Sequence, residues 1–197
     1  NYLIKFEKGF TRENGGKNPE KWFESQFPEI YKHLEPFEKK AIERTDQGDY
    51  YWELRACDYY DKFEKPKIMY QKFQVKPCFI YDAEGFFCND SMWIIPTDDK
   101  VLLGILNSKL GWWLISKYCT AIQNGYQLIW KYFSQIPIVT GDKEIRSALN
   151  QKVNDVLEQK KNNSQADTRR LENEIDELVY QLYGLTPEEQ RLVEGKS

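Results

Sequence analysis

The sequence has little of what metal sites, disulfide frameworks and membrane spans require. It contains one histidine, His33, and four cysteines that are far apart and form no Cys-x-x-Cys pair: Cys57, Cys78, Cys88 and Cys119. Zinc sites need clustered Cys and His ligands, so no metal site is expected. Scattered cysteines are typical of free thiols in a reducing cytosol, which predicts a cytoplasmic protein. No run of about eighteen apolar residues is present, so no membrane span is predicted.

The chain also lacks an excess of positive charge. Its formal net charge is −3, whereas a free-standing DNA-binding domain is usually basic. The charge is unevenly placed, because residues 142–197 carry 9 basic and 12 acidic side chains and residues 1–141 carry 19 of each. Within the neutral part, residues 62–76 hold five lysines against the single acid Glu64. Such a positive stripe on a neutral body can still contact phosphates.

Two kinds of periodicity predict an α+β fold, a mixed strand and helix domain followed by an antiparallel helical hairpin. Strands are predicted at 67–73 and 92–95, and a hairpin at 78–88 around the turn 82–85. An apolar helix capped by residues 97–99 is predicted to run on through Leu114. Aromatic pairs are expected in the core rather than as base-stacking platforms, at Tyr50-Tyr51-Trp52, Tyr59-Tyr60 and Trp112-Trp113.

The pattern changes after residue 142. Apolar residues recur at helical spacing in two stretches, 145–156 and 171–182, with a polar turn between them. This predicts two antiparallel helices, of which the second ends at Gly184. We therefore expect a recognition domain over residues 1–140 and a helical appendage over residues 142–197.

Four short motifs follow one another in a fixed order. They are Trp52-Glu53-Leu54-Arg55, Phe63-Glu64-Lys65-Pro66-Lys67-Ile68, Leu106-Asn107-Ser108-Lys109-Leu110 and Gln135-Ile136-Pro137-Ile138. Over about Phe27 to Val139, this order resembles the TaqI-like C-terminal specificity domain of adenine-specific DNA methyltransferases and fused type IIG restriction–modification enzymes. The resemblance implies a module that reads double-stranded DNA, while a methyltransferase domain of the same parent chain uses S-adenosylmethionine.

The end of this region is also similar to type I restriction specificity subunits, in which a spacer helix follows the recognition domain. That similarity implies that residues 142–183 position the recognition domain rather than touch bases. The sequence begins with Asn1 rather than Met, and we expect it to be a piece of a longer protein whose N-terminal part carries the methyltransferase domain.

Catalytic motifs are missing from the chain itself. Adenine methyltransferases need a [DNS]-P-P-[YFW] segment that holds the flipped base, and the sequence has no Pro-Pro pair. It also has no G-x-G loop for a methyl-donor cofactor. Asp98-Asp99-Lys100 resembles a nuclease motif only superficially and fits the start of a helix better. No catalytic activity is therefore expected of this chain alone.

Candidate DNA contacts fall into two chemical classes. Phosphate contacts are expected from the lysines of the positive stripe: Lys65, Lys67, Lys72 and Lys76. Base-edge contacts are expected from amides, which match the adenine edge: Gln71, Gln123, Asn124 and Gln127. Arg55 could contact either a phosphate or guanine, and the alternative to a DNA contact is a structural ion pair. Because side chains alternate along a strand, Lys67 and Gln71 are predicted to share one face with Met69 and Phe73.

Each candidate has a simpler interpretation. The lysines also fit a solvated strand face, and Gln123 to Gln127 also fit an ordinary turn. Asn107 is expected to satisfy a neighbouring main chain. For the whole chain, the main alternative is a protein-interaction module that docks a partner through its aromatic surface and helical hairpin, and a stand-alone enzyme is the third possibility.

Overall fold

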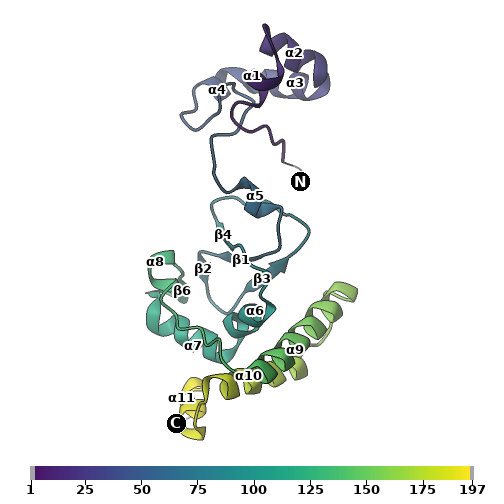
Figure 1. Ribbon diagram of the computed structural model, residues 1–197. Coiled ribbons are helices and arrows are strands. Elements are labelled where there is room, and N and C mark those ends of the chain that lie inside the picture. The colour runs from purple at the N-terminus through teal and green to yellow at the C-terminus, as the bar shows by residue number, and fades with distance from the viewer. Residues whose placement is uncertain (1–2, 196–197) are drawn as a thin grey trace. The chain divides into compact units, whose positions relative to one another are not determined.

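A computed structural model describes residues 3–195 and divides into two compact units. The first unit extends to Tyr60 and the second begins at Asp61, and each unit is described by itself. No helix within residues 3–195 is long and apolar enough to cross a membrane. Helices and short antiparallel sheets together confirm the predicted α+β class (Figure 1).

The first unit is a set of short helices around an aromatic core. The helices are α1 (Phe10–Asn14), α2 (Pro19–Gln26), α3 (Pro28–Leu34), the 3-10 helix η1 (Glu35–Phe37), α4 (Glu38–Ile42) and the start of α5 (Tyr60–Phe63). Asn18 caps α2, and a proline opens both α2 and α3. The ring of Trp52 stacks on Phe23 at 4.5 Å and on Tyr50 at 5.0 Å, measured between centroids. The expected core role of this aromatic cluster is confirmed.

The second unit contains two three-stranded antiparallel sheets. The first has the order β3-β1-β4, and the second, which we call the small sheet, has the order β2-β6-β5. The strands are β1 (Lys67–Gln71), β2 (Phe73–Gln74), β3 (Phe79–Asp82), β4 (Met92–Ile95), β5 (Thr120–Ile122) and β6 (Gly125–Gln127). The chain passes between sheets at Lys72, whose N–H donates to Ser91 and whose carbonyl accepts from the N–H of Leu128. The single strand predicted at 67–73 is therefore two strands.

The hairpin predicted at 78–88 is wrong. β3 pairs with β1, and residues 86–88 form no strand. The reason is the carboxylate of Asp82, which accepts hydrogen bonds from the backbone N–H groups of Glu84 and Phe86 at 2.9 Å each. These bonds fold the following segment into a loop. Gly85 lies within that loop at φ 79°, where a side chain would be strained.

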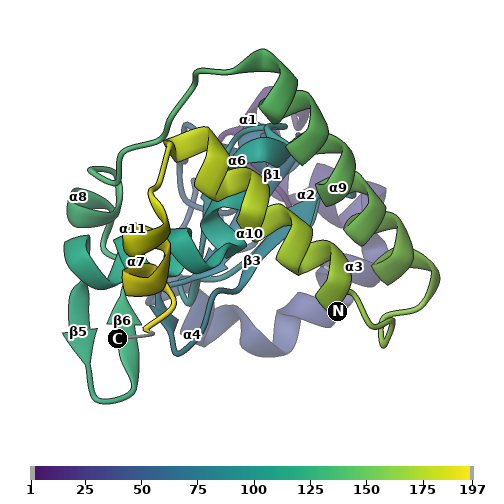
Figure 2. The same cartoon turned by 90° about the horizontal axis from the view of Figure 1, so that it is seen from below.

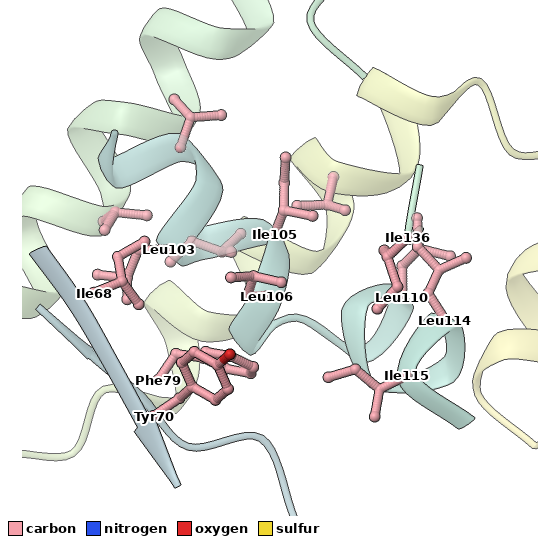
Figure 3. Close-up of a cluster of buried hydrophobic side chains, with 14 of the residues drawn as sticks. Ile68, Tyr70, Phe79, Leu103, Ile105, Leu106, Leu110, Leu114, Ile115 and Ile136 are labelled. Carbon is pink, nitrogen blue, oxygen red and sulfur yellow. The ribbon is translucent and has the colours of Figure 1, made fainter. Parts of the chain in front are cut away.

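The apolar helix predicted to run through Leu114 is two helices, α6 (Lys100–Asn107) and α7 (Lys109–Tyr118). Ser108 separates them, because its backbone is extended and its hydroxyl accepts from the N–H of Gly111 as the cap of α7. Asp99 caps α6 as expected. α6 packs on β3 and α7 packs on α6, and both helices contribute to the buried cluster that Figure 3 shows: Ile68, Tyr70, Phe79, Leu103, Ile105, Leu106, Leu110, Leu114, Ile115 and Ile136.

The helical hairpin is confirmed. It consists of α9 (Lys143–Asn162) and α10 (Arg169–Tyr183), which lie side by side in Figure 2. α10 ends at Gly184, whose φ of 66° is left-handed, and α11 (Pro187–Val193) begins with a capping box. The short α8 (Trp130–Phe133) precedes the hairpin. The expected functional division between residues 1–140 and 142–197 stays a prediction.

Candidate nucleic-acid interface

The first motif, Trp52 to Arg55, holds the first unit together. The indole N–H of Trp52 donates to the hydroxyl of Thr11 at 2.8 Å. The buried carboxylate of Glu53 accepts from three backbone N–H groups, those of Thr11 and Asp49 at 2.8 Å and that of Gly9 at 3.2 Å. Burial by itself raises the pKa of Glu53, but these hydrogen bonds outweigh it and the pKa is lowered.

Arg55 lies beyond this network. Its side chain is exposed, and an Arg55–Glu53 bridge is not among the ion pairs of residues 3–195. The carboxylate of Glu53 is already surrounded by backbone donors, which explains why it does not serve as the acid of such a pair. Arg55 belongs to the first unit, whereas the predicted lysines belong to the second.

The second motif contains a buried ion pair. The side chain of Lys67 is 0% exposed, and its ammonium donates to the carboxylate of Asp82 and, at 2.5 Å, to the carbonyl of Phe63. Although burial raises the pKa of Asp82, the hydrogen bonds from Lys67 and from the following loop lower it overall. The expectation that Lys67 lies on an exposed strand face is corrected, because both faces of β1 are covered from Lys67 to Tyr70.

The third motif connects neighbouring elements. The amide of Asn107 accepts from the N–H of Phe79 and donates to its carbonyl, both at 3.0 Å, so it occupies the outer edge of β3 as a strand would. This is the main-chain role expected for Asn107. The ammonium of Lys109 lies 3.2 Å from the carboxylate of Asp176 on α10 and 3.3 Å from that of Glu194. The motif thus joins the first sheet to the helical appendage.

The fourth motif closes the core at the start of that appendage. Ile136 is buried, and the carbonyl of Pro137 accepts from the hydroxyl of Tyr183 at 2.8 Å. All four motifs therefore supply mainly structural contacts. Most of their polar side chains are therefore occupied within the fold, whereas Arg55 and Lys65 are exposed.

The remaining predicted lysines have different surroundings. Lys65 is exposed and lies 3.2 Å from the carboxylate of Asp61. Lys72 is partly covered, with its ammonium 2.9 Å from the carboxylate of Asp90 and 5.6 Å from the centre of the Trp93 ring. Lys76 is exposed just after β2. Of the predicted amides, Gln71 is exposed at the end of β1.

The other three predicted amides lie in one hairpin. Gln123 and Asn124 form the two-residue turn between β5 and β6, and Gln127 pairs with Thr120 on one side and Phe73 on the other. Figure 2 shows this hairpin on the side of the unit away from α9, with its turn outermost. The structure therefore brings Gln123, Asn124 and Gln127 together.

Register divides the small sheet into an inner and an outer face. Gln74 and Tyr126 point inward, where Gln74 is buried and the ring of Tyr126 contacts Trp112 at 5.2 Å. The outer face consists of the opposite set, Phe73, Thr120, Ile122 and Gln127. Phe73 is 55% exposed and Ile122 is 37% exposed, so both present apolar surface on this face. The outer face thus combines apolar surface with an amide and a hydroxyl.

The segments that form the small sheet have only positive formal charges. The segments that form the small sheet, residues 71–81 and 100–141, contain no aspartate or glutamate. They contain four lysines close in sequence to the strands of the sheet: Lys72, Lys76, Lys117 and Lys131. Lys117 and Lys131 were not predicted as contacts, and the acid-free run 100–141 is the sequence signal that identifies them. Their ammonium groups lie 5.0 Å and 5.5 Å from the ring centres of Trp113 and Tyr132.

The described residues do not fit a methyl-donor cofactor. The connections from β4 to α6 and from β6 to α8 contain no glycine, so neither forms the flexible loop that such a cofactor needs. Within residues 3–195 there is also no cluster of three or more His, Cys, Asp or Glu side chains suited to a metal ion.

Comparison with known proteins supplies a family. The family described as the TaqI-like C-terminal specificity domain matches residues 15–138, which include all four motifs and the whole small sheet. The match begins before the region of the expected resemblance and ends one residue earlier. No curated protein matches the chain.

Proposed function

The chain belongs to the TaqI-like C-terminal specificity domain family, and we propose that it reads the DNA sequence for an adenine-specific DNA methyltransferase or a fused type IIG restriction–modification enzyme. In this proposal the chain positions double-stranded DNA for a catalytic domain of the same parent protein. The observation that carries the proposal is the small sheet with its four lysines and no acids.

Charge placement explains how an acidic chain can bind a polyanion. Duplex DNA carries about one negative charge per 1.7 Å of its axis, so the local field at the contact decides binding. Residues 142–197 carry the net negative charge of the chain, whereas α9 and α10 themselves have seven acidic and seven basic side chains and lie on the other side of the unit from the β5–β6 hairpin (Figure 2). This arrangement favours a positioning role for α9 and α10.

The proposed contacts are of two kinds, those to phosphates and those to base edges. Lysines beside the small sheet meet phosphates, and the amides Gln71, Gln123, Asn124 and Gln127 meet base edges. Arg55, Lys65 and Lys76 are proposed as further contacts because they are exposed. Lys67 acts indirectly in this proposal, since its ion pair fixes the strand from which Gln71 projects.

The parent protein is proposed to be cytoplasmic and to use S-adenosylmethionine, which supplies the methyl group. Because the strand-to-helix connections of this chain lack glycine, we assign that cofactor to the methyltransferase domain of the parent. The chain alone is then expected to transfer no methyl group to DNA.

Salt dependence of DNA binding tests the proposal. The affinity of the chain for a fluorescent duplex of mixed sequence is measured from low to physiological salt. We expect Lys117→Ala and Lys131→Ala each to reduce the slope of log affinity against log salt by about 0.9. Lys161→Ala on α9 is the matched control, because Lys161 is also exposed but lies on the helical hairpin. Affinity that is independent of salt, or equal effects of all three variants, contradicts the proposal.

A further inference from the structure

We propose that the outer face of the small sheet reads an A·T base pair in the major groove, through the amide of Gln127 and the ring of Phe73. This inference rests on the proposed function and specifies which bases the chain recognises and which residues do so.

The shape of the small sheet suits a groove. The major groove of B-DNA is about 12 Å wide and admits a two-stranded β-ribbon. β5 and β6 form such a ribbon, with a turn of only two residues and β5 at the free edge. A Cβ on Gly125 would lie 2.0 Å from the carbonyl oxygen of Gln74, so glycine is required for β6 to lie against β2. That close approach brings Phe73 beside the ribbon.

The register places complementary groups in one row. Phe73, Gln127 and Thr120 are direct neighbours across the three strands, and their side chains point to the same face. Directly opposed residues of antiparallel strands have Cβ atoms about 4.5–5.5 Å apart. An amide and an aromatic ring at that separation can contact the two bases of one pair.

The chemistry of the row selects A·T over G·C. A glutamine amide can bind N6 and N7 of adenine together, and an apolar side chain can contact the methyl group of thymine. Guanine is read chiefly by Arg or Lys and cytosine by Asp or Glu, and the outer face has none of these. The nearest lysine in sequence, Lys72, has its ammonium beside Asp90.

The exposure of the row also fits DNA better than a protein partner. Among residues 3–195, no hydrogen bond involves the side chains of Thr120, Gln123, Asn124 or Gln127, so these groups are available to a ligand. An apolar face alone would fit either partner. Four lysines close in sequence to the strands, in segments without an acid, favour a polyanion.

Base analogues test the inference directly. A randomised duplex library is first enriched on the intact chain, and the enriched sequence is synthesised with single-atom changes at each A·T pair. Deoxyuridine removes the methyl group of thymine, and 7-deazaadenine removes the N7 acceptor of adenine. At one pair, we expect deoxyuridine to weaken binding of the unaltered chain but not of Phe73→Ala. The 7-deazaadenine change should weaken binding of the unaltered chain by about 5- to 150-fold. The same change should cause no further loss of binding in Gln127→Ala.

Matched controls separate recognition from folding. Phe86→Ala and Gln181→Ala also remove an exposed ring and an exposed amide from the second unit, and both should keep the full response to each analogue. Suppose that a site is enriched, but Phe73→Ala and Gln127→Ala respond to the analogues as the unaltered chain does. That result overturns this inference and leaves the proposed function intact. Absence of any duplex binding at low salt overturns both.

Discussion

The two sheets of the second unit contain consecutive strands, β1 and β2, but their charged side chains differ in burial and pairing. In the first sheet, Lys67 is buried and neutralised by Asp82, and β1 is covered on both faces from Lys67 to Tyr70. In the small sheet, one face packs on the core and the other exposes Phe73 and Ile122, within segments that have lysines and no acids. In the proposed function, the first sheet is therefore the scaffold and the small sheet is the surface that contacts DNA.

This comparison also explains what the family motifs report. Glu53, Lys67, Asn107 and Lys109 all bond to other parts of their own unit. Motifs of this kind specify a fold and are poor guides to base recognition. The residues proposed to read bases lie outside the four motifs.

The largest expected effect is on the scaffold. Lys67→Ala leaves the carboxylate of Asp82 without its buried partner, so the free energy of unfolding should fall by about 3–5 kcal/mol. Urea unfolding followed by circular dichroism measures the change. Lys65→Ala is the control, because that side chain is exposed and should cost little. Equal stability of the two variants would remove the distinction between buried and exposed lysines.

Glu53 should make the first unit sensitive to acid. Its pKa in the folded state is lowered, so the stabilisation is present above the ordinary pKa of 4.5 and is lost as pH falls through the folded value. Glu53→Gln should reduce the free energy of unfolding at neutral pH by about 1.5–3 kcal/mol. It should also flatten the acid side of the stability profile, measured by urea unfolding between pH 3 and 7. A profile unchanged by Glu53→Gln would refute this role.

A smaller effect is expected at the edge of the first sheet. Asn107→Ala removes the amide that bonds to both backbone groups of Phe79, which should lower the free energy of unfolding by about 1–3 kcal/mol. Amide hydrogen exchange should show faster exchange at Phe79 in this variant. Asn173→Ala, a change of the same kind on α10, should leave that exchange rate unaltered.

The smallest effect on stability is expected around the small sheet. Lys117→Ala and Lys131→Ala should change the free energy of unfolding by no more than about 0.5 kcal/mol, because both ammonium groups lie at the surface. Thermal unfolding checks this alongside the salt slope of DNA binding. A loss of stability comparable with that of Asn107→Ala would assign these lysines to the scaffold.

Local rules predicted the local features well. The cap at Asp99, the helical hairpin and the helix end at Gly184 all depend on residues close together in sequence. Asn107 was expected to bond a main chain, because a buried amide needs partners, although its partner Phe79 lies far away in sequence.

Long-range partners explain most of what the sequence did not predict. Pairing of β1 with β3 and β4 depends on tertiary packing, so the local hairpin at 78–88 was a wrong prediction. Alternation along a strand predicted an exposed face for Lys67, but a sheet covered on both sides has no such face. The three amides predicted at 123–127 do lie in one hairpin, and their contact with DNA stays a prediction, while Phe73, Lys117 and Lys131 became candidates only from the structure.

The two-residue turn of Gln123 and Asn124 has a consequence for evolution. Within residues 3–195, their side chains make no hydrogen bond to the rest of the fold, and neither does that of Gln127. Substitutions there should cost little free energy of folding. In the proposed function, a lineage can therefore exchange these residues one at a time and acquire a new target sequence without first acquiring a more stable protein.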